Sequence, residues 1–369
     1  MHNTQRLLMV DPMKIEYTVS RGRRKDKQGD FGTVQGGNWD RRCSQFHRMD
    51  VWRAFKQHFV KGVPWQQTRF YRRVIDAIAR GAIKWGCKTK AQFDTRCEEL
   101  DQLYEQIRTE GFRQQSALEG KENSLDDVSV CIDRHGRLLF EDGRHRLCIA
   151  KLLKLKSIPV QVSLRHTKWF DFCQKVEQYS THFRGRVYAP LPHPDLDNFP
   201  TIQGGERFKI ISEALGDCSG TLLDIGAHWG YFSHRFEKLG MTCTAVEHET
   251  RHLYFLGQLR TAVGAKFDIY DGSIFDFKLN HFDVTLALNI FHHFLKQPET
   301  FEQLKHFLQQ LDTKCLIFQP HLHNSRQMKG AYRNFKPLQF VDWVLKNTGL
   351  SQAKRLGAAK DGRPIYLLT

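Results

Sequence analysis

The sequence contains no run of about 18 apolar residues, so it predicts no membrane-spanning helix. Its nine cysteines are scattered and form no Cys-x-x-Cys pair, which argues against a zinc site and against a disulfide framework. We find no internal repeat and no low-complexity tract. These absences favour a globular protein with reduced cysteines, and we expect it to be cytoplasmic.

Positive charge is abundant and uneven. The formal net charge is +16, and residues 1–200 carry 36 basic against 24 acidic side chains, a net charge of +12. A basic N-terminal half suggests an anionic partner such as a phosphate, a nucleotide, a nucleic acid or a membrane surface. The alternative is a solvated basic face that only maintains solubility.

A length of 369 residues predicts about two domains. We predict an irregular basic arm over residues 1–40, because the charge run 21–27 is followed by several glycines. A helical plus α+β domain is expected over 41–185, and an α/β domain over 201–369. The four prolines of the segment 186–200 predict an extended linker or a substrate-side loop between the two.

Apolar spacing in the first domain predicts two amphipathic helices, one over 70–81 and one that begins after Thr89 and ends at Gly111. The pattern then predicts strands at 128–133 and 137–141, a helix over 144–154 and a strand at 158–162.

The strongest motif lies in the second domain. An apolar strand, Thr221–Ile225, leads into a glycine turn and a helix over 231–239, and the next strand ends in Glu247. Glycines let the backbone approach a ligand at the end of the strand, and helix N-terminal amides favour a negative group there. An acidic residue at the end of the second strand can accept hydrogen bonds from both hydroxyls of a ribose.

Asp224-x-Gly226-x-x-x-Gly230 resembles motif I of class I S-adenosylmethionine-dependent methyltransferases, and the resemblance extends over residues 200–369. It implies a Rossmann-like, mostly parallel sheet of seven strands with one antiparallel strand. It also implies that S-adenosylmethionine is the cofactor. The cofactor-binding residues that it implies are Asp224, Gly226, Ala227, His228 and Gly230 in the loop, Glu247 for the ribose, and Ser273 and Ile274 in the adenine-contacting turn.

The fourth strand, Phe282–Leu288, ends at Asn289, and His292 and His293 follow it. This stretch resembles motif IV of the same family, where substrate and methyl group meet. A histidine there can act as the general base for a hydroxyl acceptor, and we favour His292 because it lies three residues after Asn289. A mononuclear metal site is the alternative, but no Asp or Glu lies beside these histidines at ligand spacing.

The N-terminal domain carries a second candidate site, Gly143-Arg144-His145-Arg146, at the start of a predicted helix. Cationic side chains and free backbone amides together make a phosphate-binding site. The alternative is that these basic residues only pair with Glu141 or Asp142.

Together with the strand that contains Ile158-Pro159-Val160, this box resembles the ParB/sulfiredoxin-like fold over residues 122–165. That resemblance implies a nucleotide triphosphate with magnesium at residues 143–146. Gly62-Val63-Pro64-Trp65 and Trp85-Gly86-Cys87 resemble ParB-like proteins found beside surface-polysaccharide genes. No helix-turn-helix follows the box, which counts against a role in DNA segregation.

These observations lead us to expect a two-domain enzyme that methylates a hydroxyl or phosphate oxygen of a saccharide or related small molecule. Two alternatives stay open: a nucleic-acid methyltransferase docked by the basic half, and a non-catalytic binding protein. The sequence lacks Asn-Pro-Pro-Tyr and Asp-Pro-Pro-Tyr, which mark many amino-directed nucleic-acid methyltransferases, so the first alternative is less favoured.

Overall fold

The computed structural model describes residues 7–19, 32–113, 127–216 and 218–369. The chain divides into two compact units, Met1–Lys175 and Val176–Thr369. The boundary falls inside helix α6 (Thr167–Thr181), upstream of the predicted linker at 186–200. Val187, Leu191 and Leu196 are buried, so the proline-rich segment packs as part of the second unit. Proline spacing indicated an extended backbone but did not reveal this burial.

The first unit contains one sheet in the order β1-β7-β5-β6-β2-β4, and β3 pairs with the C-terminal part of β7. The strands are β1 (Leu7–Val10), β2 (Tyr17–Thr18), β3 (Thr33–Gln35), β4 (Ser44–Gln45), β5 (Ser129–Ile132), β6 (Leu138–Asp142) and β7 (Ile158–His166). Three of them lie within residues 1–40, so the prediction of an irregular arm is wrong for the described part. The charge run 21–27 lies outside the described residues.

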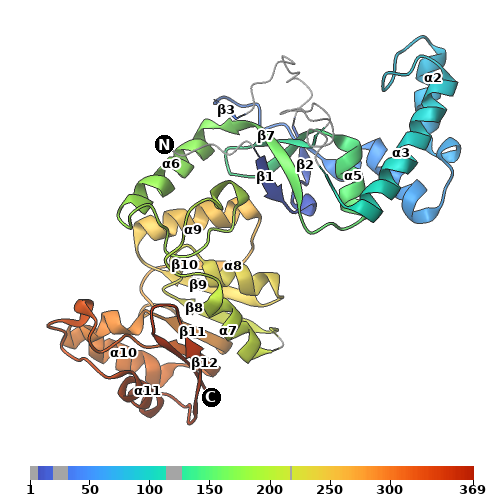
Figure 1. The fold of residues 1–369 in the computed structure, drawn as a ribbon. Helices are drawn as coiled ribbons and strands as arrows, with labels where there is room; N and C mark the ends of the chain where they lie inside the picture. Colours follow the sequence, from blue (N-terminus) through green and yellow to red (C-terminus); the bar gives the residue numbers. More distant parts are fainter. Residues whose placement is uncertain (1–6, 20–31, 114–126, 217) are drawn as a thin grey trace. The chain divides into compact units, whose positions relative to one another are not determined.

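The predicted helices of this unit are confirmed. They are α2 (Arg69–Ala79), α3 (Lys90–Glu110) and α5 (Arg144–Leu152), and a short helix α1 (Asp50–Phe55) precedes them (Figure 1). Thr89 caps α3 with a reciprocal capping box to Gln92, which satisfies two amides that the helix leaves free. Within the described ranges, no helix combines the length and apolar character that crossing a bilayer demands.

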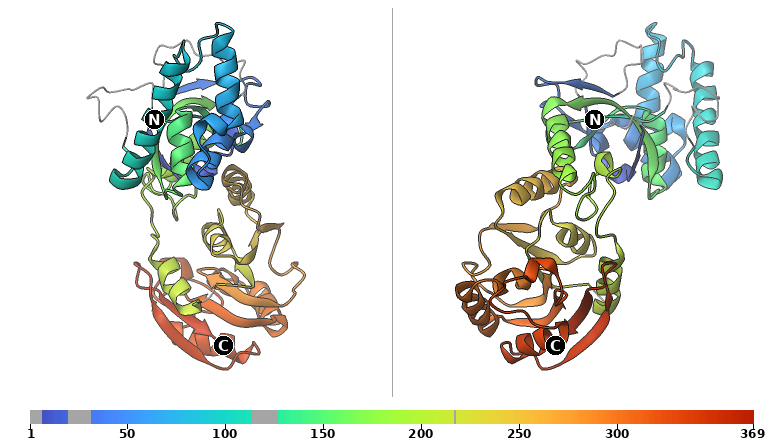
Figure 2. Two further views of the ribbon diagram at one scale, coloured as in Figure 1. Left: turned by 90° about the vertical axis from the view of Figure 1, so that its right-hand side faces the viewer. Right: turned by 60° about the vertical axis from the view of Figure 1, so that its left-hand side comes forward.

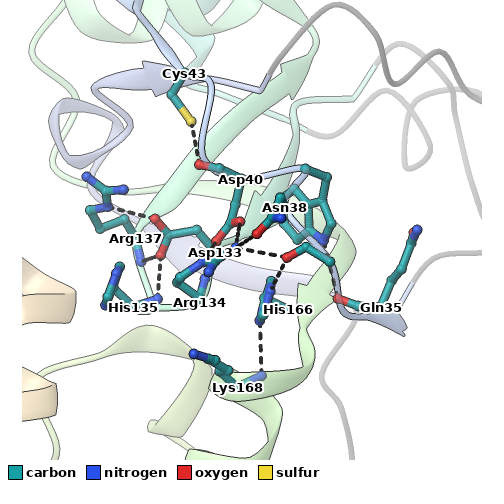
Figure 3. A network of polar contacts seen from close by, with 12 residues as sticks. Gln35, Asn38, Asp40, Cys43, Asp133, Arg134, His135, Arg137, His166 and Lys168 are labelled. Atoms are coloured by element: carbon teal, nitrogen blue, oxygen red, sulfur yellow. Dashed lines mark hydrogen bonds and ion pairs between the residues drawn. The ribbon is translucent and has the colours of Figure 1, made fainter.

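A buried ion pair between Asp40 and Arg134 attaches the loop before β4 to the turn between β5 and β6, and a second pair, Asp133 with Arg137, lies within that turn (Figure 3). Asp40, which is 3% exposed, accepts hydrogen bonds from Arg134 Nε at 2.8 Å and from the Arg134 amide at 3.0 Å. Asp133 accepts from Arg137 Nε at 2.7 Å. Burial alone would raise the pKa of Asp40, but the hydrogen bonds and charge of Arg134 outweigh it and lower that pKa to about 2.

The second unit contains a seven-stranded sheet in the order β10-β9-β8-β11-β12-β14-β13. Its strands are β8 (Thr221–Ile225), β9 (Thr242–Glu247), β10 (Asp268–Asp271), β11 (Phe282–Leu288), β12 (Thr313–Gln319), β13 (Ala353–Ala358) and β14 (Pro364–Leu368). The pairs from β10 to β12 are parallel, and β14 is antiparallel to both β12 and β13. The predicted mostly parallel sheet with one antiparallel strand is therefore confirmed.

Helices flank this sheet (Figures 1 and 2). They are α7 (Glu206–Leu215), α8 (Tyr231–Lys238), α9 (Thr250–Val263), α10 (Pro298–Gln310) and α11 (Pro337–Lys346). Leu304 of α10 and Phe340 of α11 join Leu223 and Phe318 of the sheet in one buried apolar cluster. Each such side chain contributes about 1.5–3 kcal/mol by leaving water. This packing fixes the strand ends from which the candidate site is built.

Candidate methyltransferase site

The loop between β8 and α8 has a backbone that requires glycine at both ends. Gly226 has φ 69° and Gly230 has φ 77°, a region that other residues adopt only at a cost. A Cβ atom on Gly226 would lie 2.8 Å from Ile290 Cδ1, and one on Gly230 would lie 2.5 Å from Leu256 Cδ1. The two glycines that the motif singled out thus allow both the turn and the close packing behind it.

Glu247, at the end of β9, ties this loop to its neighbour. Its Oε2 accepts the amide of His228 at 2.8 Å, and its Oε1 accepts the amides of His248 and Glu249, each at 2.9 Å. The residue is 5% exposed. A carboxylate offers about four acceptor positions, so three backbone amides leave about one for a ligand. Glu247 is a structural cross-link as well as a candidate ribose ligand.

Asp224 is buried beneath the loop and accepts a hydrogen bond from Ser233 Oγ at 2.8 Å. Burial raises the pKa of Asp224 to about 6, against the opposing effects of Ser233 and Arg207. Its bond to α8 holds the strand and the following helix together.

A small first cavity of about 30 Å³ opens against the loop, with room for one or two water molecules. Four of the predicted cofactor-binding residues line it, namely Asp224, Gly226, Ala227 and His228, and their role in binding stays a prediction. No motif in the sequence points to the other lining residues, which are Tyr188, Ala189, Arg207, Ile225, Trp229, Tyr231, Phe232 and Leu288. A nucleoside-sized ligand needs more space than this, so binding requires lining side chains to move.

Arg207, from α7, is the buried cation of this cavity. Its NH1 donates to Gln319 Oε1 at 3.2 Å, and its guanidinium lies 5.5 Å from the ring of Tyr188 and 5.3 Å from that of Phe232. Arg207 Nε and Trp229 Nε1 are buried and make no hydrogen bond within the described part of the chain. Buried donors without partners are costly, and a polar ligand in the cavity would satisfy them.

Tyr179, near the end of α6, contacts the loop from outside. Its hydroxyl lies 3.1 Å from His228 Nε2 and 3.2 Å from His252 Nε2. Since a phenol has one proton, it donates to one imidazole and accepts from the other. Burial and the neighbouring His252 lower the pKa of His228 well below its ordinary value, so the ring is neutral near pH 7.

After β11, the structure buries His292, the histidine that the spacing favours as the general base, and exposes His293. Asn289 has φ 65°, donates to Tyr188 Oη at 3.2 Å and accepts from Arg363 NH1. His292 is 2% exposed and packs near His321, whereas His293 is exposed. The turn after β11 is a 3-10 helix, and it places His293, rather than the favoured His292, at the accessible position.

Both histidines are weak bases. Burial, followed by repulsion from His293 and His321, lowers the pKa of His292 to about 3. His293 is exposed, but partial desolvation of its ring by its neighbours, followed by Lys296 and Arg363, lowers its pKa to about 4. Catalysis by either of them as a general base stays a prediction, and these low pKa values count against it.

A second cavity of about 420 Å³ adjoins Asn289. Tyr188 lines both cavities. The other residues of the second cavity are Phe183, Ile202, Gln203, Asn289, Lys360, Asp361 and Arg363. Its volume is typical of a site for a small molecule.

The predicted adenine-contacting turn follows β10. Ser273 Oγ accepts the amide of Phe275 at 3.2 Å, and Ile274 is buried in the apolar core of the unit. Neither residue lines the first cavity, and their role in cofactor binding stays a prediction.

The predicted phosphate site of the first unit is only partly assembled. Gly143 has φ 81°, and a Cβ there would lie 2.7 Å from Val128 Cα, so this corner requires glycine. Arg144 is exposed at the start of α5. However, the His145 ring lies 4.3 Å from Trp85, and Arg146 lies 4.7 Å from the ring of Phe112. Burial lowers the pKa of His145 to about 3.

No group of three or more metal-ligating side chains occurs among the residues that the structure describes.

Residues 223–310 match the family model of a methyltransferase domain. The match begins at β8 and extends through α10, so it includes the glycine loop, Glu247 and Asn289. This part of the chain is therefore similar to a methyltransferase domain. A comparison with curated proteins gives no match.

Among solved structures, the bifunctional kinase-methyltransferase WbdD is similar over 52% of this chain and 45% of its own, with a TM-score of 0.42 and 19% identity. The chain thus spans less than half the length of that protein. The N-methyltransferase NodS from Bradyrhizobium japonicum WM9 has a TM-score of 0.36 and 14% identity over 44% of this chain and 92% of its own. Magnesium protoporphyrin IX methyltransferase from Synechocystis PCC 6803, solved with bound SAM, has a TM-score of 0.33 and 16% identity over 44% of this chain and 79% of its own. At these TM-scores the likenesses carry no conclusion about substrate.

Proposed function

We propose that the second unit is an S-adenosylmethionine-dependent methyltransferase that acts on a hydroxyl or phosphate oxygen of a saccharide or related small molecule. One observation carries this proposal: the matched domain has a glycine loop in left-handed backbone beside a buried carboxylate at the end of the next strand. The saccharide class rests on the resemblance of the N-terminal region to ParB-like proteins found beside surface-polysaccharide genes.

Arg207 in the first cavity, and Glu247, which does not line the cavity but bonds to the His228 amide, fit such a cofactor. Arg207 offers a buried cation with a free Nε to the carboxylate of the amino acid part, and Glu247 offers its remaining acceptor position to the ribose. Bound S-adenosylmethionine supplies a methyl group activated on a positively charged sulfur. The aromatic side chains that line the cavity exclude water around it, and Tyr188 lines both this cavity and the second one.

The acceptor oxygen would approach from the end of β11. Asn289 orients the wall there through its bonds with Tyr188 and Arg363. His293 is neutral above about pH 4 and can accept a hydrogen bond from a hydroxyl, but it binds a proton weakly. A phosphate oxygen is already ionised and needs no base, whereas a neutral hydroxyl does.

Cofactor binding tests the proposal directly. Isothermal calorimetry of the full chain should detect S-adenosylmethionine, and Arg207→Gln should weaken binding by about tenfold, the effect of one charge-assisted hydrogen bond. The control Arg355→Gln removes an exposed arginine of the same unit and should bind like wild type. Absence of binding in the wild-type chain would refute the methyltransferase proposal.

For the first unit we retain the ParB-like, nucleotide-binding hypothesis. The glycine corner at Gly143 and the exposed Arg144 support it, whereas the packing of His145 and Arg146 counts against it. Melting temperatures with ATP, CTP and ADP, with and without magnesium, test the hypothesis. If no nucleotide stabilises the wild type more than Arg144→Ala, the corner is structural.

A further inference from the structure

The second cavity is enclosed by three segments that are distant in sequence. Phe183, Tyr188 and Gln203 come from the chain between α6 and α7, Asn289 follows β11, and Arg363 lies in the hairpin turn before β14. Its walls combine two aromatic rings with two amide side chains and three charged groups. It adjoins the first cavity through Tyr188, so a ligand in it lies beside the proposed methyl donor.

The charges of this cavity do not cancel. Asp361 is its only lining carboxylate, and protein groups already occupy it: Gln203 Nε2 donates to Oδ2 at 2.8 Å, and the Arg363 amide donates to Oδ1 at 3.2 Å. Arg363 Nε lies 3.5 Å from the same carboxylate. Lys360 is exposed and forms no ion pair with any described residue. One cation therefore faces the cavity without a counter-charge.

The positive charge of Arg363 also acts on the histidines that follow β11 and β12. After burial, the Arg363 guanidinium contributes to lowering the pKa of His292, His293 and His321. The same arginine lines the second cavity. A negatively charged ligand here would meet Lys360 and Arg363 directly.

We propose that the second cavity is the acceptor site and that the acceptor is a hydroxyl-bearing small molecule with an anionic group, a phosphate or a carboxylate, bound by Lys360 and Arg363. The aromatic faces and the amides of Asn289 and Gln203 contact its uncharged part. This inference rests on the proposed methyltransferase function. It adds to that function a requirement for negative charge on the acceptor.

The test measures binding of three probes to the full chain by ligand-observed NMR: glucose 6-phosphate, glucuronate and glucose. At least one anionic probe should bind about tenfold more tightly than glucose, as one charge-assisted hydrogen bond predicts, and the two anionic probes distinguish phosphate from carboxylate. Lys360→Gln should remove most of this preference, and Lys360→Arg should restore it. Lys354→Gln, an exposed lysine on the same hairpin that does not line the cavity, should behave like wild type.

S-adenosylmethionine affinity, measured in parallel, separates this inference from the proposed function. Retained cofactor binding with equal affinity for all three probes would overturn the anionic acceptor and leave the methyltransferase intact. Weaker cofactor binding in Lys360→Gln would assign this cation to the cofactor and would also overturn the inference. An anion preference without any cofactor binding would instead refute the methyltransferase and, with it, the acceptor role of the cavity.

Discussion

Replacing Glu247 by glutamine should destabilise the second unit by about 2 kcal/mol. The wild-type carboxylate accepts three backbone amides, two on Oε1 and one on Oε2. Glutamine keeps one oxygen for the His248 and Glu249 amides, but its NH₂ group would face the His228 amide, which is also a donor. A buried donor without an acceptor costs about 1–3 kcal/mol. Glu247→Ala removes all three acceptors and should cost about 3–5 kcal/mol, since each lost bond adds to this amount.

Urea unfolding at constant pH measures these losses, and calorimetry with S-adenosylmethionine on the folded variants measures the ligand role separately. Asp268→Asn makes the same change of charge at an exposed carboxylate on β10 with no hydrogen bond to the loop, and it should change stability by less than about 0.5 kcal/mol. A Glu247→Gln variant as stable as wild type would refute the cross-link. Unchanged cofactor affinity in that variant would refute the ribose role.

The other predictions concern the backbone, acid stability and catalysis. Gly143→Ala should destabilise the first unit by more than about 2 kcal/mol, because its Cβ would meet the backbone of Val128, whereas Gly81→Ala has the same positive φ in open space and should cost about 1 kcal/mol; melting temperatures compare the two. Asp40 has a pKa of about 2, below its ordinary value, so its stabilisation is present above about pH 4 and is lost as the pH falls toward 2; Asp40→Asn should flatten that part of the acid-unfolding profile. With an ionised acceptor, His293→Ala should reduce turnover less than threefold, and a hundredfold loss would instead indicate base catalysis by this residue.

The second unit could largely be predicted from the sequence because its signals are local. Strand, glycine turn, helix and Glu247 follow one another within thirty residues, and both glycines of the motif lie where the backbone requires glycine. The walls of the cavities could not be predicted in this way. Tyr188 and Arg363 reach the site only through tertiary packing, and each looks ordinary in its own stretch of sequence.

Where the structure differs from the expectation, the causes are similar. The three-residue spacing from Asn289 favours His292 as the accessible histidine, but the 3-10 helix after β11 buries this side chain. His145 lies in a basic box, yet aromatic side chains from a distant segment surround it. The strands at 7–10 and 17–18 are short, and each pairs with a strand more than a hundred positions away, although β2 also pairs with β4, so no local alternation marks them.

Tyr188 lines both cavities, so the affinity of each cavity for its ligand can depend on whether the other cavity is filled. If one ligand favours a particular position of this ring, it changes the free energy of filling the other cavity. Linkage requires the effect to be reciprocal: whatever factor the first occupant applies to the affinity of the second, the second applies to the first. The strength of this coupling depends on the freedom of a single aromatic side chain, whose hydroxyl accepts a hydrogen bond from Asn289 and whose ring lies near the Arg207 guanidinium.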